Sequence, residues 1–413
     1  MNIYALNKPL KSTILVIFFD SPFNSPLNDH KHQNFEIEIF HFNQMSDTFE
    51  NSYEIITHIG TGGYGKVFKA RNKETGEIFT IKRMLNSNNK KDNFQEIIHR
   101  EINAFSAISN LEVDEISKRN VANLRDVIYS ETKSYVYLVF DYFEYDLSDI
   151  LKKWKGIPVS FAKSYFHQLL QGLKIIHQAG FLHRDIKPHN IVLSPGNIVK
   201  ITDLGLSRNI NYDCKRPMTN QIITMWYKPP EILLGATQYG PEVDVWSLGC
   251  TFYEMMTGEP LFVGGTESEV YTAITNSIGS PNEENWPEWS RLPNASIFSK
   301  RNHSNVDANK FFMKHLPEQY QEARFLLMKM LQISPSKRIT IQESLNDPYL
   351  NGSDVLPPEK LPMLTFEEVS KDDASLSPKR SSKRSKPVVT SRKSGANQNK
   401  MLRPAYNLPP III

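Results

Sequence analysis

The pattern of apolar residues changes once along this chain, near residue 144, and this change limits the folds available to it. Between Tyr53 and that point, short segments alternate or run apolar as strands do; they read YEIITHIG, GKVFKARN, EIFTIKRM and SYVYLVFDYF. A helical pattern, NFQEIIHREINAFSAI, lies among them. After Leu147 the spacing becomes mostly helical, as in FAKSYFHQLLQGLKIIHQAG, which ends at Gly180, a residue suited to cap a helix. The sequence therefore predicts an α+β fold with a small strand-rich lobe and a larger helical lobe.

Three stretches of different character follow from this pattern. Residues 1–52 are rich in Asn and Phe without clear periodicity, so we expect a flexible N-terminal extension; one hypothesis is that translation begins at Met45. Residues 53–350 form the folded domain, with the N-terminal lobe at 53–143 and the C-terminal lobe at 144–350. Residues 351–413 are rich in Pro, Ser, Lys and Arg, which predicts a disordered basic tail.

The charges are unevenly distributed along the chain. From Lys379 to the C-terminus there are nine basic residues and no acidic one, so the remaining 39 basic and 45 acidic residues give the rest a net charge of −6. A mildly acidic body does not favour direct binding of nucleic acid. The stretch PKRSSKRSK (Pro378–Lys386) is typical of a nuclear localisation signal, although a solvated basic tail explains it too. We therefore expect a nuclear protein, with the cytoplasm as a second compartment.

Cysteine content and hydropathy bear on the environment of the protein. The two cysteines, Cys214 and Cys250, argue against a disulfide framework and fit a reducing compartment. The longest N-terminal apolar run, ILVIFF, is far shorter than the ~20 residues that a membrane span requires. We therefore expect no association with a membrane.

The segment GTGGYG supplies Gly60, Gly62 and Gly65, followed by Val67. Glycines let the backbone approach phosphate oxygens closely, with N–H groups pointing inward. A similar spacing occurs in dinucleotide-binding folds, but there the loop opens a helix. Here the loop opens KVFKA, which alternates like a strand. The pattern therefore favours a hairpin that covers phosphates.

Charged residues at the ends of predicted elements suggest a nucleotide and metal site. Lys82 lies at the end of the third strand and alone reads better as a surface lysine, but Glu101 on the following helix is a partner that would hold it in place. Asp203 ends a strand and is followed by a glycine two residues later, which suits Mg²⁺ coordination. Asn190 supplies a second oxygen of the kind that Mg²⁺ prefers.

The stretch GFLHRDIKPHNIVL (Gly180–Leu193) places polar residues inside an otherwise apolar segment. Burying such groups costs free energy unless each finds a partner or a ligand. One interpretation is a polar turn between two strands. The other is an active-site loop, with Asp185 as a base and Asn190 as a metal ligand.

Taken in order, these motifs resemble the signature of the eukaryotic protein kinases. The resemblance rests on the Gly-rich loop, Lys82, Glu101, His183-Arg184-Asp185 with Asn190, and Asp203-Leu204-Gly205. It extends over Tyr53–Leu350 and includes PPE (Pro229–Glu231), DVWSLGC (Asp244–Cys250) and Arg338. It implies a bilobal protein kinase fold that uses ATP and Mg²⁺.

The resemblance also implies a role for each polar residue. Lys82, paired with Glu101, would hold the α- and β-phosphates of ATP. Asp203 and Asn190 would hold Mg²⁺, and Asp185 would accept the proton of the substrate hydroxyl. Lys187 would lie near the transferred phosphate, and His183 would be structural. The nucleotide site would further include Ile59, Gly60, Gly62, Gly65, Val67, Asp141 and Phe143.

Two positions depart from the kinase pattern. Leu204 replaces the Phe of Asp-Phe-Gly and keeps the apolar contact, so we still expect activity. Thr80, in FTIK, replaces an Ala and puts a hydroxyl where adenine would lie. We expect this hydroxyl to lower the affinity for nucleotide modestly.

Three segments resemble the cyclin-dependent branch of the proline-directed kinases: ITMWYKPPEILLG, PLFVGGTESEVYTAITNSIGSPNEENWPE and DYFEYDL. Some elements resemble the transcriptional members that act on the C-terminal domain of RNA polymerase II. The resemblance implies a cyclin partner and Ser/Thr-Pro protein substrates in transcription or cell-cycle control. A mitogen-activated kinase is the alternative, but it would carry Thr-x-Tyr where this chain has Thr219 and Gln221. An inactive scaffold would lack Lys82, Asp185 or Asp203, and all three are present.

The resemblance further implies regulatory and specificity positions. Thr219 matches an activating phosphorylation site on which Arg100, Arg184 and Arg208 converge. Tyr64, at the tip of the Gly-rich loop, is a candidate inhibitory phosphorylation site, although an unmodified aromatic is an equally good interpretation. Ile223 and Lys228 line the pocket for the residue after the phosphoacceptor, and a preference for proline is expected there.

Overall fold

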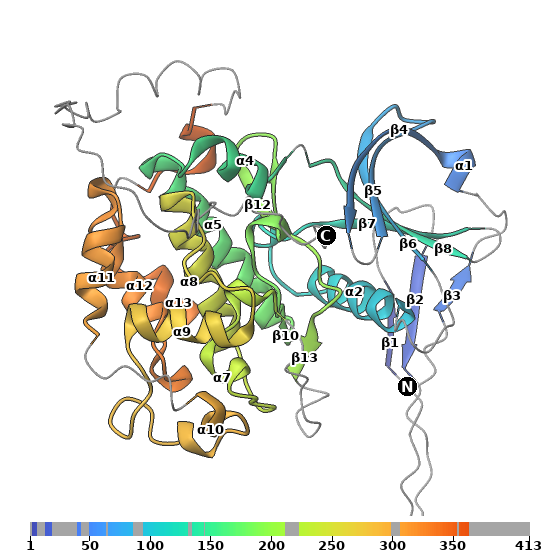
Figure 1. The fold of residues 1–413 in the computed structure, drawn as a ribbon. Helices are drawn as coiled ribbons and strands as arrows, with labels where there is room; N and C mark the ends of the chain where they lie inside the picture. The colour runs from blue at the N-terminus through green and yellow to red at the C-terminus, as the bar shows by residue number, and fades with distance from the viewer. Residues whose placement is uncertain are drawn as a thin grey trace, which may run out of the picture.

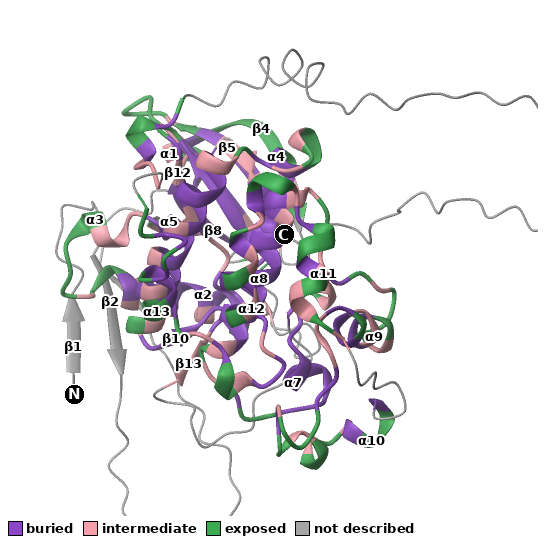
Figure 2. Cartoon of the chain, turned by 90° about the vertical axis from the view of Figure 1, so that its left-hand side faces the viewer, coloured by how far each residue is buried: buried purple, intermediate pink, exposed green. Residues whose placement is uncertain are grey.

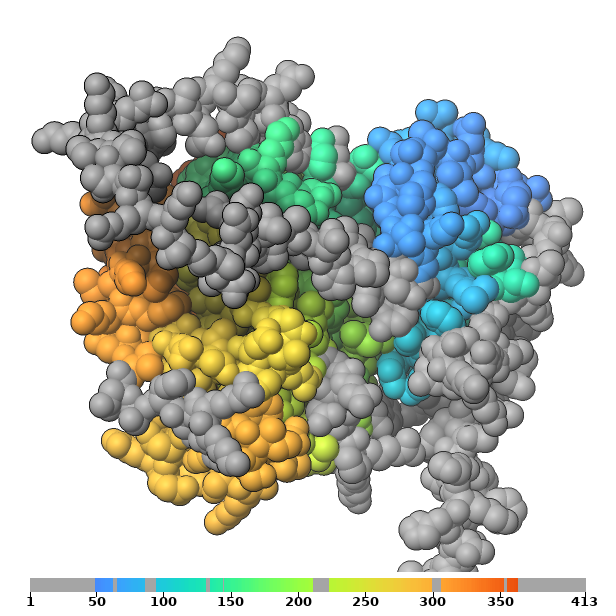
Figure 3. Space-filling view, viewed as in Figure 1, coloured from blue at the N-terminus to red at the C-terminus, as the bar shows by residue number. Residues whose placement is uncertain are grey.

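The computed structural model describes residues 2–5, 13–18, 39–42, 49–62, 65–85, 94–130, 134–143, 145–210, 223–298, 306–352 and 355–362. Its two lobes follow the predicted order, with strands first and helices after them (Figure 1). The space-filling view shows the blue N-terminal lobe at the upper right and the yellow and orange residues of the C-terminal lobe at the left (Figure 3). The predicted bilobal α+β fold is confirmed.

An antiparallel sheet of five strands forms the N-terminal lobe, in the order β4-β5-β6-β8-β7. The strands are β4 (Tyr53–Gly62), β5 (Gly65–Asn72), β6 (Ile78–Leu85), β7 (Leu124–Tyr129) and β8 (Tyr135–Asp141). On β8, Leu138 and Phe140 belong to the main core, whereas Tyr137 and Val139 pack in a second cluster. Because alternate residues of a strand point to opposite faces, both faces of β8 are buried, which explains its continuous apolar sequence.

Helix α2 (Phe94–Ser109) packs against the sheet at β6 and β7 and also contacts the C-terminal lobe through α5. Its buried residues recur at helical spacing and include Ile98, Ile102 and Phe105. The Phe105 ring meets that of Phe140 edge-on, with centroids 5.3 Å apart. The apolar stripe therefore fixes which side of α2 faces the sheet, and with it the direction of Glu101.

Additional elements precede this sheet. Strands β1 (Asn2–Ala5), β2 (Thr13–Phe18) and β3 (Ile39–Phe42) pair as a separate three-stranded antiparallel sheet. The short helix α1 (Phe49–Ser52) leads into β4. Its Phe49 is buried and stacks on Tyr137 with ring centroids 4.0 Å apart. The second cluster of the sheet thus includes a residue that lies before Tyr53.

Helices α5 (Val159–Gln178) and α8 (Glu242–Thr257) form the centre of the C-terminal lobe. They contact each other, and Phe166 stacks on Phe252 at a centroid distance of 3.8 Å. Figure 2 shows buried residues gathered around these helices. As predicted, Gly180 follows α5 with a left-handed backbone, φ 83°.

Smaller helices surround this pair: α3 (Glu115–Lys118), α4 (Leu147–Trp154), α7 (Pro230–Leu233), α9 (Glu267–Ile278), α10 (Ala295–Phe298), α11 (Ala308–His315), α12 (Ala323–Met330) and α13 (Ile341–Leu345). Arg338 forms a buried ion pair with Glu231 of α7 at 2.6 Å. This pair joins the PPE segment to the chain between α12 and α13. Among the residues described, no helix is both long and apolar enough to cross a membrane.

Short strands hold the loops that lie between the lobes. They are β9 (Tyr145–Asp146), β10 (Phe181–Leu182), β11 (Ile191–Ser194), β12 (Ile198–Ile201) and β13 (Arg208–Asn209). Strand β11 pairs with β12 and with β9, and β10 pairs with β13. The polar stretch HRDIKPHN therefore runs from β10 through a short 3-10 helix (Pro188–Asn190) into β11.

Candidate active site

Lys82 is the centre of a buried ion-pair chain. Its ammonium lies 2.9 Å from Oε2 of Glu101 and 3.0 Å from Oδ1 of Asp203. Lys82 is on β6, Glu101 is on α2 and Asp203 follows β12, so the chain joins three elements. The predicted partner of Lys82 is therefore in place, and Lys82 is not a surface lysine.

Within these ion pairs, the neighbouring charges shift the pKa values of Lys82 and Asp203 so that both side chains are ionised. Burial alone would lower the pKa of Lys82, but Asp203 and Glu101 outweigh it and raise that pKa above its ordinary value. Burial also opposes ionisation of Asp203, yet the ammonium of Lys82 holds the pKa of this carboxyl below its usual range. Burial raises the pKa of Glu101, and Lys82 works against that rise. A fixed cation thus stands beside an ionised carboxylate.

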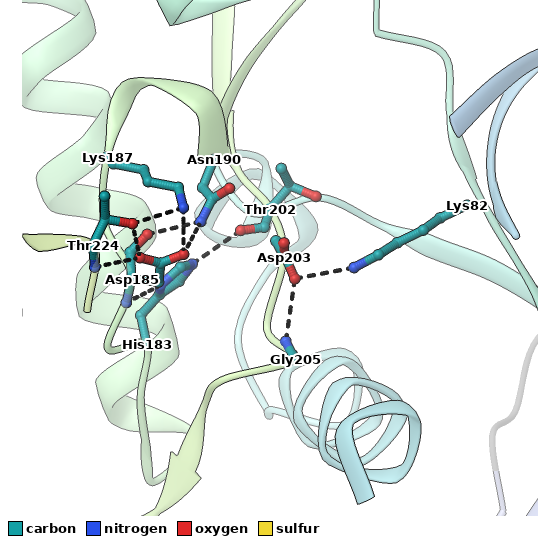
Figure 4. A network of polar contacts seen from close by, with 9 residues as sticks. All are labelled: Lys82, His183, Asp185, Lys187, Asn190, Thr202, Asp203, Gly205 and Thr224. Atoms are coloured by element: carbon teal, nitrogen blue, oxygen red, sulfur yellow. Dashed lines mark hydrogen bonds and ion pairs between the residues drawn. The ribbon is translucent and has the colours of Figure 1, made fainter. Parts of the chain in front are cut away.

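Asp185 is held by hydrogen bonds to both carboxylate oxygens (Figure 4). Thr224 donates its backbone N–H at 3.1 Å and its hydroxyl at 2.8 Å to Oδ1. Asn190 donates its side-chain N–H to Oδ2 at 3.0 Å, and the Lys187 ammonium lies 2.8 Å from the same oxygen. Lys187 also donates to the Thr224 hydroxyl at 2.8 Å. The carboxylate of Asp185 and the ammonium of Lys187 therefore have the partners that their burial requires.

The backbone of this loop is anchored by Asp244, a fully buried residue of α8. Its carboxylate accepts the backbone N–H groups of His183 at 2.9 Å and Arg184 at 2.8 Å, and it also contacts His177 at 2.9 Å. Arg184 has a left-handed backbone with φ 67°, which is unfavourable for a residue other than glycine. The sequence gives Asp244 no role of its own; its one visible signal is a carboxylate inside the apolar helical run DVWSLGC.

His183 has the structural role that the resemblance implied. Its Nδ1 accepts the backbone N–H of Asp185 at 3.1 Å, so its Nε2 carries the proton and donates to the carbonyl of Thr202 at 2.9 Å. Both ring nitrogens are therefore occupied by the backbone. The side chain therefore fixes the backbone of the loop.

Two oxygens of this site fit a divalent cation. Asn190 is buried and uses its side-chain N–H₂ on Asp185, which leaves Oδ1 buried without a hydrogen-bond partner. Asp203 supplies an ionised carboxylate nearby (Figure 4). No group of three or more His, Cys, Asp or Glu residues that could hold a metal occurs in the described ranges. This donor set suits Mg²⁺, which takes one or two carboxylates and completes its shell with waters and phosphates.

The Gly-rich segment forms the predicted hairpin. Gly60 pairs with Val67 and Gly62 with Gly65 across β4 and β5, so the loop opens a strand and not a helix. A Cβ at Gly65 would lie 2.3 Å from the carbonyl oxygen of Arg83, so only glycine fits there. Ile59, on the same hairpin, is exposed at 47% of its surface. Tyr64 lies outside the described residues.

The connection between the lobes begins at Asp141, which ends β8 and pairs with Arg125. Phe143 follows and is buried. Its backbone N–H donates to the hydroxyl of Thr80 on β6 at 3.1 Å. The two residues assigned to the nucleotide site thus lie at the end of β8, the strand that pairs with β6, which carries Lys82.

Arg184 interacts electrostatically with Arg100 and Arg208, the two other arginines that the resemblance assigns to Thr219. Arg184 is buried, with its Nε donating to the Leu206 carbonyl and its Nη1 to the Tyr239 hydroxyl. Burial lowers the pKa of Arg184, and the like charges of Arg100 and Arg208 lower it further. Arg184 is therefore repelled by both of the other arginines. Thr219 lies outside the described residues.

Comparison with known proteins agrees with this geometry. The protein kinase domain model matches residues 53–350. The chain is 38% identical over 322 residues to cyclin-dependent kinase 12 of Caenorhabditis elegans, covering 75% of this chain and 42% of that kinase. It is 36% identical over 307 residues to cyclin-dependent kinase B2-1 of Oryza sativa subsp. japonica, covering 72% of this chain and 90% of the rice kinase.

A solved structure shows the same fold. It is the CAK complex from Chaetomium thermophilum bound to ATP-gamma-S, with a TM-score of 0.65 and 29% sequence identity. The match covers 76% of this chain and 96% of that one. Together with the family match and the rice relative, it identifies this chain as a protein kinase of the cyclin-dependent kinase family.

Proposed function

We propose that this chain, with a cyclin as partner, transfers the γ-phosphate of ATP to serine or threonine residues followed by proline, in transcription or cell-cycle control. The observation that carries the proposal is the set of ion pairs Glu101–Lys82–Asp203, which places a fixed cation next to the loop of Asp185. Figure 4 shows Asp203 between Lys82 and Asp185. The ATP-gamma-S in the related CAK complex supports a nucleotide as the phosphate donor.

The residues divide the work of phosphoryl transfer. Lys82 would bind the α- and β-phosphates, and Glu101 keeps its ammonium in position. Asp185 would accept the proton of the substrate hydroxyl, and the hydrogen bonds from Thr224 and Asn190 fix the direction of its carboxylate. Lys187, beside Asp185, would balance negative charge on the transferred group.

Asn190 and Asp203 would hold Mg²⁺, which when bound neutralises charge on the phosphates. The unpartnered Oδ1 of Asn190 is the atom best suited to this, because it is buried and uncompensated by the protein. Gly205 supports the position of Asp203. A Cβ at Gly205 would lie 2.9 Å from Ile97 and 3.3 Å from Oδ1 of Asp203, so α2 packs closely only against glycine.

Catalytic roles are tested by two conservative substitutions. Asp185→Asn should remove the base, and Asp203→Asn should weaken nucleotide-metal binding; both should reduce phosphate transfer to a protein substrate at least a hundredfold. Melting temperatures and circular dichroism should stay near those of the wild type. As a matched control, Asp149→Asn changes an exposed carboxylate of α4 and should leave turnover unchanged. Near-normal activity of either active-site variant would refute the role assignment.

The preference for proline rests on Ile223. This buried, β-branched residue has φ 66°, a strained conformation, and directly precedes Thr224, which contacts Asp185. We infer that the twisted backbone cannot offer its carbonyl to the residue after the phosphoacceptor. A residue with an N–H would then lose a hydrogen bond on binding, whereas proline has none to lose.

Lys228 stands close to this pocket. It is buried and donates to Glu267 of α9 at 2.6 Å. Its single ammonium lacks the planar fork of arginine, so the preference for proline is expected to be relaxed.

A peptide library with every residue at the position after Ser or Thr should therefore select proline, by roughly tenfold over alanine. Replacing Ile223 with glycine, which adopts a positive φ without strain but gives the backbone freedom to rotate, should weaken this selection. Equal rates with proline and alanine in the wild-type protein would remove this part of the proposal.

A further inference from the structure

Thr80 makes a contact that involves the connection between the lobes. It lies on β6 and is 5% exposed, and its hydroxyl accepts the backbone N–H of Phe143 at 3.1 Å. Phe143 comes just after β8. Its N–H is bonded by a side chain that lies 63 residues earlier in the sequence. A backbone donor just after β8 is thus already engaged by the protein itself.

The backbone of Thr80 cannot move to release this contact. Thr80 pairs with Lys69 of β5 and with Phe140 of β8, so it sits inside the sheet ladder on both sides. Only rotation about χ1 can withdraw the hydroxyl. β-Branched side chains have few allowed χ1 rotamers. In each rotamer of Thr80 either the hydroxyl or the methyl group faces buried protein atoms.

The chemistry of adenine competes for the same donor. Position N1 of the ring is a hydrogen-bond acceptor, and a backbone N–H is its natural partner. If Phe143 contacts the base, as its expected place in the nucleotide site implies, one N–H faces two acceptors. A hydroxyl displaced into a buried site without a new partner costs free energy.

We propose that the Thr80 hydroxyl competes with the adenine ring of ATP for the Phe143 N–H and thereby sets a weaker nucleotide affinity. The inference rests on the proposed function, because it needs ATP as the ligand, and on the expected place of Phe143 in the nucleotide site. The effect of one such hydrogen bond corresponds to about a three- to tenfold change in the dissociation constant. Thr80 is thus a residue that tunes affinity and takes no part in the chemical step.

Binding of ATP, measured by titration calorimetry, tests this with three substitutions. Thr80→Val keeps the shape of the side chain without the hydroxyl and should bind ATP about three- to tenfold more tightly. Thr80→Ala should also bind more tightly and serves if the valine variant does not fold. Thr80→Ser keeps the hydroxyl and, as the matched control, should stay near the wild type.

A second ligand identifies the atom involved. The triphosphate of 1-deazaadenosine lacks the N1 acceptor, so Thr80→Val should bind it no more tightly than the wild-type protein does. An equal gain for both ligands would overturn the inference, because the N–H would then not be the shared donor. Weaker ATP binding by Thr80→Val would also overturn it, since the hydroxyl would then contact the base favourably.

The outcomes also separate this inference from the proposed function. Equal ATP affinity of the wild type and Thr80→Val would refute the competition alone. Absence of ATP binding by all four folded proteins, checked by their melting temperatures, would refute the nucleotide site itself and the competition with it.

Discussion

At the scale of single residues, burial and the charges around the catalytic loop set the pKa of His189. It precedes Asn190 and lies 3.2 Å from the Ser148 hydroxyl through its Nε2. Burial, followed by the charges of Lys187 and Lys152, lowers its pKa to about 4, although Asp149 and Asp185 oppose this. The imidazole is therefore neutral in the folded protein at pH 7, and the ordinary pKa of about 6.5 applies only after unfolding.

This depressed pKa predicts a loss of stability in acid. Between pH 6.5 and 4 the unfolded chain binds the proton more readily than the folded one, so the free energy of unfolding falls as the pH falls. The loss due to His189 should be on the order of 2 kcal/mol at pH 4, after allowance for partial exposure. His189→Gln cannot titrate and should show a shallower decline in urea unfolding over this range. Parallel curves for both proteins would contradict the assignment.

At the scale of elements, two adjacent residues of α2 connect this helix to the site. Glu101 pairs with Lys82, and Arg100, now bound to Glu96 one turn earlier, neighbours Arg184 electrostatically. A phosphate on Thr219 would draw the arginines together and hold α2 in place. A cyclin pressing on the same helix would favour the same position, so the two signals should reinforce each other.

We therefore expect activity to need both a cyclin and phosphorylated Thr219. Thr219→Ala should lower the rate of peptide phosphorylation at least tenfold in the cyclin complex, because the repulsion among the arginines would remain. Thr257→Ala, at the end of α8, is a control that removes another threonine away from the site. Full activity of the unphosphorylated monomer made in bacteria would show that the loop needs neither signal.

The sequence predicts long elements better than the short ones that complete the site. Strands β5, β6 and β8 and helices α2 and α5 follow from periodicity, because each buries apolar residues at the spacing of its element. Strand β4 also forms as predicted, although Ile55, Ile56 and Ile59 on it are exposed. Strands β9, β10 and β13 have two residues each, which is too short for a pattern. Their positions depend on tertiary contacts, such as those of Asp244 to a backbone 60 residues earlier.

Site residues divide in the same way. The order and spacing of the motifs in the sequence are enough to identify Lys82, Asp185, Asn190 and Asp203. Thr224 was not assigned a contact with Asp185, because 39 residues separate them and threonine alone signals little. The contact of Thr80 with the Phe143 N–H needs the pairing of β6 with β8, which local sequence does not specify.

At the scale of the whole molecule, charge separates the kinase domain from the tail. The nine basic residues after Pro378 contrast with the net charge of −6 on the rest of the chain. This tail lies outside the described residues, so its sequence carries the argument. We propose that the first five of these basic residues, in PKRSSKRSK, form a nuclear localisation signal. An import receptor binds a short, dense cluster of basic residues and does not respond to total charge.

The alternative is that the tail is merely a solvated basic segment, in which any of its charges would be equivalent. Two full-length variants with nearly equal loss of charge distinguish these cases. Glutamine replaces the clustered residues Lys379, Arg380, Lys383, Arg384 and Lys386 in one variant, and the dispersed residues Arg392, Lys393, Lys400 and Arg403 in the other. As fluorescent fusions, the first should lose nuclear enrichment, as should a chain truncated at Lys371, whereas the second should keep it. Equal localisation of both full-length variants would mean that position within the tail does not matter, and the nuclear signal would be refuted.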